Sequence, residues 1–229
     1  MKNFKNLEKN LGVKFNNQDL LKMAVVHRSY LNEHKNFELD HNERLEFLGD
    51  AVLELITTEY LYKNYPHPEG DLTNWRASLV NAKMLAEVSA RLKIEEFMYL
   101  SKGEQQDTNP KARNYILANA VEALIGAIYL DQGIEAAKKF INEHILSQLP
   151  YILANHLYLD PKSKFQERAQ ENRSVTPTYK VLEETGPDHN KYFKIGVYLE
   201  QELVAEGEGT SKQEAQVNAA EKALENKGW

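Results

Sequence analysis

Cysteine is absent from the 229-residue chain. Disulfide bonds and thiolate metal ligands are thereby excluded. Long apolar runs are also missing, since the longest, residues 123–130, is far too short to span a bilayer. The first eleven residues alternate Lys and Asn with single apolar residues, which is not the pattern of a secretory signal. We therefore expect a soluble, cytoplasmic protein with no membrane partner.

An excess of basic residues is lacking as well. The chain carries 28 Lys and Arg against 34 Asp and Glu, a formal net charge of −6. Both halves share the acidic excess. Proteins that bind nucleic acid usually carry a basic domain or stripe, so the charge argues mildly against such a partner. Any surface that binds RNA must therefore be a local patch.

The most informative stretch is HNERLEFLGDAVLELI, residues 41–56. At about 100° per residue, four carboxylates fall on one side of a helix and five apolar residues on the other. The carboxylates are Glu43, Glu46, Asp50 and Glu54, and the apolar residues are Leu45, Leu48, Val52, Leu55 and Ile56. Such a column is usually a solvated face. However, Phe47 lies on the acidic side, and almost no Lys or Arg stands at i+4 to relieve the repulsion. Packed carboxylates without cationic partners favour a divalent cation.

A second stretch, ILANAVEALIGAIYL at residues 116–130, is apolar nearly all round and predicts a buried helix. Asn119 and Glu122 share one face of it with Gly126. An isolated buried carboxylate is costly, so Glu122 needs a partner. One candidate is a metal ion held jointly with Glu46 and Asp50, and the other is a hydrogen bond to a helix terminus or to an Arg. The residues alone leave both open.

Together, HNERLEFLGDAVLEL and ILANAVEALIGAIYLDQG resemble the paired catalytic motifs of bacterial ribonuclease III, in the same order and at a matching separation. The resemblance extends over essentially the whole chain. It implies that Asp50 and Glu122 are catalytic and position the attacking water. It also implies that Glu46, Asn119 and Glu122 hold Mg²⁺, for which Mn²⁺ can substitute, and that no small-molecule cofactor is needed.

Further expectations follow from the same resemblance. Glu43 and Glu69 are supporting acidic residues, with a plain loop carboxylate as the alternative for Glu69. Asn119 departs from the family, which more often has Asp there, so we expect weaker Mg²⁺ binding or a preference for Mn²⁺. The family is a homodimer, and Phe47 is a candidate interface residue. The alternative for Phe47 is an aromatic residue of the chain's own core.

The flanking segments give a coarse helical outline. We predict a short helix, a turn at Gly12 and a second helix over residues 18–32 that His27 helps to end. His27 is interpreted as a hydrogen-bonded packing residue without a catalytic role. After a break at residues 65–71, Asp71 is predicted to cap a helix that continues to about Arg91. Residues 101–113 are predicted to be a loop, and a last helix should end near residue 149.

In the C-terminal region, the pattern of long helices gives way to shorter alternating segments. Residues 150–160 are the best candidate for a linker, and a helix, three strands and a helix capped by Ser211 follow. This order resembles a double-stranded-RNA-binding domain, which reads the shape of A-form RNA. By that resemblance the residues that contact RNA are Gln166, Glu167, His189 and Lys212. Gln213 and Gln216 stand where a basic cluster is common, so we expect weak binding with a modest salt dependence.

The predicted fold class is therefore multi-domain α and β. Residues 1–152 form an all-α ribonuclease III catalytic domain, 153–160 a linker, and 161–229 an α-β-β-β-α double-stranded-RNA-binding domain. The predicted function is Mg²⁺-dependent endonucleolytic hydrolysis of double-stranded RNA to 5′-phosphate and 3′-hydroxyl ends, in the processing of ribosomal RNA precursors and other structured transcripts. No Ser or Cys nucleophile motif indicates a covalent intermediate. The alternative is a non-cleaving protein, either a double-stranded-RNA binder or ribosome-associated, that retains the fold.

Overall fold

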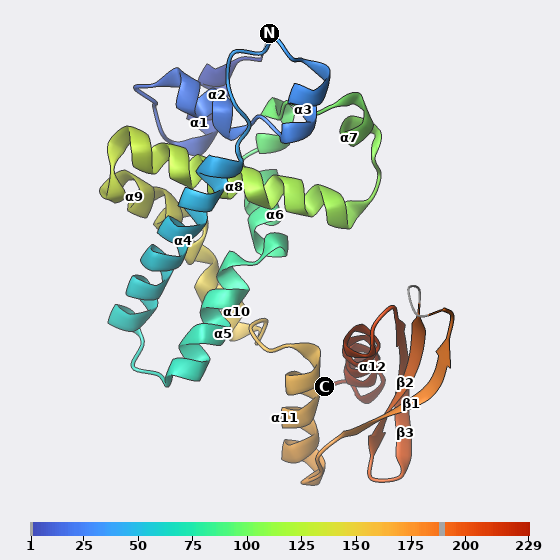
Figure 1. The fold of residues 1–229 in the computed structure, drawn as a ribbon. Helices are drawn as coiled ribbons and strands as arrows, with labels where there is room; N and C mark the ends of the chain where they lie inside the picture. The colour runs from blue at the N-terminus through green and yellow to red at the C-terminus, as the bar shows by residue number, and fades with distance from the viewer. Residues whose placement is uncertain (1, 188–190) are drawn as a thin grey trace. The chain divides into compact units, whose positions relative to one another are not determined.

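A computed structural model describes residues 2–187 and 191–229, and these form two compact units, residues 1–155 and 156–229 (Figure 1). The first unit is helical, and the second combines two helices with a three-stranded sheet. The predicted fold class is thereby confirmed. Among the described residues, no helix is both long enough and apolar enough to cross a membrane.

The first unit consists of ten α-helices and two short 3₁₀ helices over its described residues. They are α1 (Phe4–Leu11), α2 (Gln18–Ala24), α3 (Arg28–Glu33), α4 (Glu43–Asn64), α5 (Glu69–Val80), α6 (Ala82–Arg91), η1 (Ile94–Phe97), α7 (Lys102–Gln106), α8 (Pro110–Gln132), α9 (Ile134–His144), η2 (Leu146–Gln148) and α10 (Leu149–Ala154). Helix α8 lies at the centre, because α2, α4, α6 and α9 all pack against it. Its middle, residues 117–128, is apolar on almost every side and almost entirely buried, as predicted.

The predicted second helix, residues 18–32, is wrong in one respect. The chain leaves the helix at Val25 and Val26 and pairs with Tyr99, whose backbone N–H donates to the Val25 carbonyl at 2.8 Å. His27 then starts α3, where its Nδ1 accepts from the Ser29 N–H, instead of ending a helix. A contact with a residue far along the sequence overrides the local helical pattern, which no helix periodicity reveals.

Three other boundaries also differ from the prediction. Helix α5 begins at Glu69, so Asp71 lies in its first turn and does not cap it. The predicted helix to Arg91 breaks at Asn81, whose side chain caps α6 by accepting from the Met84 N–H at 2.9 Å. Within residues 101–113, α7 and the start of α8 are helical, since Asn109 caps α8.

The second unit contains α11 (Pro161–Arg173), β1 (Thr178–Thr185), β2 (Tyr192–Leu199), β3 (Glu202–Gly209) and α12 (Lys212–Lys227). The strands form one antiparallel sheet in the order β1-β2-β3. Ser211 caps α12 by accepting from the Glu214 N–H at 3.1 Å, as predicted. The α-β-β-β-α order read from the sequence is confirmed.

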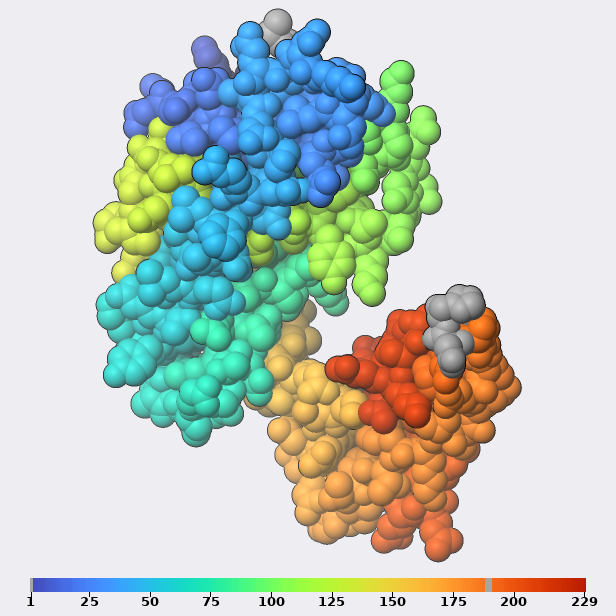
Figure 2. All heavy atoms as spheres, in the orientation of Figure 1, coloured from blue at the N-terminus to red at the C-terminus, as the bar shows by residue number. Residues whose placement is uncertain are grey.

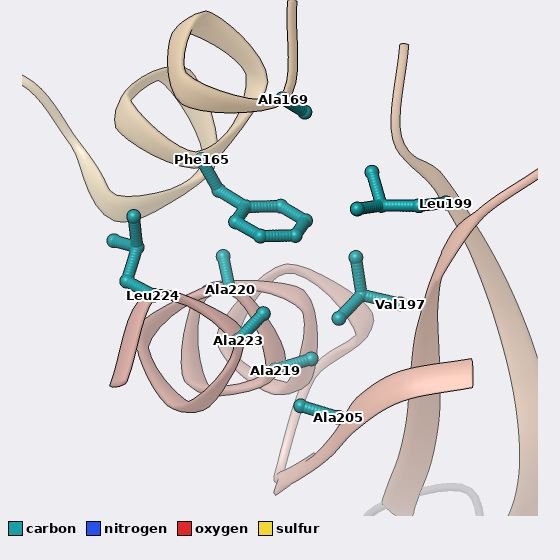
Figure 3. Packing of buried hydrophobic residues seen from close by; sticks show 9 residues of the cluster. All are labelled: Phe165, Ala169, Val197, Leu199, Ala205, Ala219, Ala220, Ala223 and Leu224. Atoms are coloured by element: carbon teal, nitrogen blue, oxygen red, sulfur yellow. The ribbon is translucent and has the colours of Figure 1, made fainter. Parts of the chain in front are cut away.

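The core of this unit lies between the helices and one face of the sheet. Figure 3 shows Phe165 of α11 pointing into the space between α12 and the sheet, where small alanines of α12 face it. The members of this buried cluster are Phe165, Ala169, Val197, Leu199, Ala205, Ala219, Ala220, Ala223 and Leu224. A Cβ on Gly207 would lie 2.1 Å from the Ala219 backbone nitrogen. Glycine and alanine therefore let α12 approach β3 closely.

Candidate active site

Helix α4 presents the column of carboxylates that the sequence predicts. Glu46 is partly exposed, and Glu43 and Asp50 are exposed, while Leu45, Val52 and Ile56 are buried on the other side. Leu55 departs from the predicted core face, since 64% of it is exposed. The helix therefore has three faces rather than two: an acidic face, a core face and an exposed apolar face.

Helix α8 crosses α4 beside this column (Figure 1). The approach is so close that a Cβ on Gly49 would lie 1.8 Å from the Glu122 carbonyl oxygen, and one on Gly126 would lie 2.3 Å from the Leu45 carbonyl oxygen. Only glycine fits at both positions without moving backbone. The crossing places Asn119 and Glu122 next to the carboxylates of α4. The helical pattern predicted that Gly126 shares a face with Glu122, but it did not indicate that Gly49 packs against the same helix.

The carboxylates at the crossing influence one another. Burial, and then the nearby charges of Asp50, Glu46 and Glu54 in that order, together raise the pKa of Glu122 to about 7. Burial also raises the pKa of Glu46, as do the charges of Glu43 and Asp50, whereas a hydrogen bond from the Asn119 side chain lowers it. The charged forms of Glu46 and Glu122 are therefore costly, which is the condition under which a cation binds favourably.

The two ends of the column are neutralised by cations from other helices. At one end, Arg28 of α3 lies 3.4 Å from a Glu43 carboxylate oxygen. At the other end, the Arg76 Nε of α5 lies 2.9 Å from Glu54, and its Nη1 donates to the Thr58 hydroxyl at 2.9 Å. These partners were missed because the i+4 rule considers only the same helix. No ion pair between described residues involves the central Glu46, Asp50 or Glu122.

The central donors suit a hard divalent cation, because carboxylate and amide oxygens are the ligands that Mg²⁺ and similar ions prefer. As the side chains stand, no three Asp, Glu or His side chains in the described part of the chain converge at metal-binding distance. Carboxylates of like charge without a cation between them repel one another. The donor chemistry and the raised pKa values of Glu46 and Glu122 nevertheless fit a metal ion at this crossing.

Two predicted residues lie outside this group. Glu69 is the first residue of α5 and accepts from the Thr73 hydroxyl at 3.3 Å, beside a cavity of about 640 Å³ between α4 and α5. It is not among the charges that shift the pKa of Glu46 or Glu122. His27 is engaged with Ser29 at the start of α3, and burial lowers its pKa, so it is neutral near pH 7.

Phe47 lies on the exposed apolar face of α4, with 82% of its surface accessible. The chain's own core therefore does not hold it. Ala51, Leu55 and Tyr62 follow it at helical spacing, and Tyr62 is 80% exposed. In the space-filling view, atoms of α4, coloured blue to cyan, form a long strip on the visible surface (Figure 2). A cavity of about 700 Å³, lined by Leu20, Met23, Leu48 and Leu130 among others, lies beside Phe47.

In the second unit, three of the four residues predicted to contact RNA are described. Gln166 and Glu167 are exposed on α11, and Lys212 is the first residue of α12. The Lys212 ammonium lies 5.5 Å from the centre of the Phe193 ring. His189 lies outside the described residues. All three side chains are exposed and can therefore reach a large ligand.

Fold and site together define a two-part protein, with a helical unit that gathers acidic residues and a small α+β unit. The Ribonuclease-III-like family model matches residues 17–149, and the Double-stranded RNA binding motif matches residues 161–227. Ribonuclease 3 of Carboxydothermus hydrogenoformans is 45% identical over 225 residues, which cover 97% of this chain and 95% of that protein. Ribonuclease 3 of Oceanobacillus iheyensis is 43% identical over 221 residues, 96% of each chain.

A solved structure agrees with these sequence comparisons. The nuclease domain of ribonuclease III from Campylobacter jejuni is 39% identical, with a TM-score of 0.56 over 65% of this chain and 99% of that one. That nuclease domain shows structural flexibility in a region involved in dimer formation. The chain belongs to the ribonuclease III family, the endoribonucleases that cut double-stranded RNA.

Proposed function

We propose that this protein hydrolyses phosphodiester bonds in double-stranded RNA with Mg²⁺, leaving 5′-phosphate and 3′-hydroxyl ends. The single observation that supports this most is the α4–α8 crossing. Two glycines there bring Glu46, Asp50 and Glu122 near one another, while the cations paired with the column among residues 2–187 and 191–229 stand at its two ends. An arrangement that gathers unpaired charge at a cost in stability indicates a site built for a ligand.

The residues would divide the work as follows. Glu46, Asn119 and Glu122 hold the metal ion, directly or through water. A bound divalent cation would favour ionisation of a water molecule and stabilise charge on the phosphate. Asp50 and Glu122 accept hydrogen bonds from the attacking water at their carboxylate oxygens and orient it toward the phosphorus. Glu43 and Glu69 are supporting acidic residues, and Arg28 limits the negative charge that Glu43 adds.

We also propose that the protein acts as a homodimer. One active site cuts one strand, so cutting both strands in register requires two sites in fixed opposition. The exposed apolar face of α4, with Phe47 at 82% exposure and a cavity of about 700 Å³ beside it, supports a self-complementary contact. Sedimentation velocity of Phe47→Ala should show monomers, whereas Leu203→Ala, an exposed apolar residue of the other unit, should stay dimeric. A monomeric wild type at micromolar concentration would contradict the proposal.

The division of the chain supports a tethered RNA-binding unit. Residues 1–152 would be the catalytic domain, 153–160 the linker and 161–229 the RNA-binding domain, with Gln166, Glu167, His189 and Lys212 on RNA. Helix α10 ends at Ala154 and Pro161 starts α11, so only residues 155–160 between them lie outside helices. The protein would act in the cytoplasm, on ribosomal RNA precursors and other structured transcripts.

The decisive experiment is cleavage of a labelled RNA duplex in Mg²⁺ and in Mn²⁺. Glu122→Gln is the control against contaminating nuclease, because it keeps the size of the side chain and removes the charge. Cleavage by the wild type alone supports the proposal, and faster cleavage in Mn²⁺ indicates that Asn119 is a weakened ligand. Binding without cleavage in either metal would favour the non-cleaving alternative. The observation behind this alternative is Asn119, which is neutral where the family more often has Asp.

A further inference from the structure

Helix α12 carries Gln216 one turn after Lys212, so only one of these two positions provides a cation. Residues four apart on a helix lie on the same face. In the folded unit, Lys162, the second residue of α11, donates a hydrogen bond from Nζ to the Gln216 Oε1 at 2.7 Å. A lysine from another helix therefore places its ammonium group at the position where α12 itself has none.

The Lys162 ammonium is held in place without a direct ion pair, although its charge helps to lower the pKa of Asp160 after the hydrogen bonds from Ser163 and from the Lys162 backbone. It lies 5.1 Å from the centre of the Tyr179 ring, which contributes a cation–π contact. No ion pair between described residues involves Lys162. The nearest acidic residue in sequence, Asp160, caps α11 through the backbone N–H groups of Lys162 and Ser163 and the Ser163 hydroxyl. An ammonium group has three donors, so Lys162 retains donors for a further acceptor.

Lys212 is comparably available. Its ammonium lies above the Phe193 ring and 3.9 Å from Glu184, a carboxylate that Lys191 already approaches to 2.8 Å. Lys212 stands at the start of α12, and Lys162 contacts Gln216 one turn further along the same helix. Two cations one turn apart on a helix can each contact a phosphate of one RNA strand, and the Gln216 amide N–H₂ is a neutral donor on the same helix.

We propose that Lys162 supplies, from α11, the phosphate-binding cation that α12 lacks at Gln216. Lys162 and Lys212 together then hold the backbone of double-stranded RNA, with no preference for base sequence. This inference rests on the proposed function, in which the second unit binds double-stranded RNA. It also revises the expectation from the sequence that binding is weak, because the packing of α11 restores one cation that the α12 sequence lacks.

Salt dependence tests this role directly. Binding of the full chain to a labelled duplex longer than about 16 base pairs is measured in EDTA, which prevents cleavage, over a series of KCl concentrations. Lys162→Gln should lower the slope of log affinity against log salt by about one. Affinity near 0.15 M salt should fall about five-fold, the contribution of one released counterion. Lys162→Arg should keep the slope.

A charge-relocation variant separates phosphate binding from a structural role. Lys162→Gln combined with Gln216→Lys moves the cation onto α12 and should restore the wild-type slope. Lys222→Gln, near the far end of the same helix, is the matched control and should leave the slope unchanged. A Lys162→Gln slope equal to that of Lys222→Gln, or a double variant that restores nothing, would overturn the inference. A wild type that binds no duplex at all would instead overturn the proposed function and this inference with it.

Discussion

The α4–α8 crossing and the α12–β3 contact both depend on a glycine that allows close backbone approach, but the two contacts surround their charges differently. A Cβ on Gly49 would lie 1.8 Å from the Glu122 carbonyl oxygen, and one on Gly207 would lie 2.1 Å from the Ala219 nitrogen. In the RNA-binding unit, the close approach buries alanines, and acids of the same unit such as Glu202 have a pKa lowered by lysine and arginine partners. At the α4–α8 crossing it gathers carboxylates whose pKa values are raised.

The pairing of charges, rather than the close packing, distinguishes a structural contact from a ligand-binding site. Close approach alone is common to both regions and says nothing about function. Charges that are paired as they come together stabilise a scaffold, whereas like charges gathered without partners raise the free energy of the empty protein. Such a cost is offset only when a ligand binds. Five substitutions test this distinction between paired and unpaired charges.

The largest effects should come from adding a methyl group at each glycine. Gly49→Ala forces α4 and α8 apart, and a displacement near 1 Å at a catalytic group costs about 100-fold in rate. It should therefore abolish most cleavage and destabilise the first unit by about 1–3 kcal/mol or more, while binding of duplex RNA persists. Gly207→Ala should weaken RNA binding by disturbing α12. Equal loss of both activities in either variant would contradict separate roles.

Removing the charge of Glu122 should produce a pH-dependent gain in stability. Its folded pKa of about 7 lies above the usual 4.5, so wild-type stability is full below pH 4.5 and is lost as pH rises through 7. Glu122→Gln should lack this loss. Because Glu122 is only half-buried, we expect the variant to be more stable at pH 8 by about 1–2 kcal/mol, and equally stable at pH 4.

Urea unfolding in EDTA, followed by tryptophan fluorescence, measures this difference. The two tryptophans lie in different units, Trp75 in the first and Trp229 in the second. A Trp229→Phe background therefore isolates the unit that contains Glu122. Added Mg²⁺ should reverse the order of stabilities near pH 8. A stability difference that does not change with pH would contradict the electrostatic explanation.

A smaller effect is expected at Asn119. Asn119→Asp adds a negative charge to the donor set, so Mg²⁺ affinity in isothermal titration calorimetry should rise roughly ten-fold. Asn74→Asp, on the exposed side of α5, changes the net charge by the same amount and should leave the affinity near that of the wild type. Equal Mg²⁺ affinity in Asn119→Asp and wild type would show that Asn119 does not weaken the site.

The smallest effect should come from a paired charge in the scaffold. Lys194 of β2 lies 2.6 Å from a Glu206 carboxylate oxygen of β3, and both side chains are about one-third exposed. Partly exposed pairs contribute little, so Lys194→Gln should lower the thermal midpoint of the second unit by less than about 2 °C. Differential scanning calorimetry would measure it. A much larger shift would mean that scaffold pairs also carry substantial energy.

Helical periodicity predicted the acidic face of α4 and the burial of α8, because both patterns lie within one element. It wrongly assigned Leu55 to the core, and it wrongly predicted one continuous helix through Val25 and Val26. The first error arose because an exposed apolar face and a core face look alike in sequence. The second arose because the pairing with Tyr99 joins residues far apart in the chain.

The sequence by itself determined the order of the elements, the residues that bear charge and the family to which they point. Only the tertiary structure decided which charges are paired. Arg28 and Arg76 neutralise the ends of the carboxylate column from other helices. Lys162 of α11 donates a hydrogen bond to Gln216 of α12. The physical reason is that local propensity follows from neighbours in the chain, whereas electrostatic pairing depends on distances in space that the chain acquires when it folds.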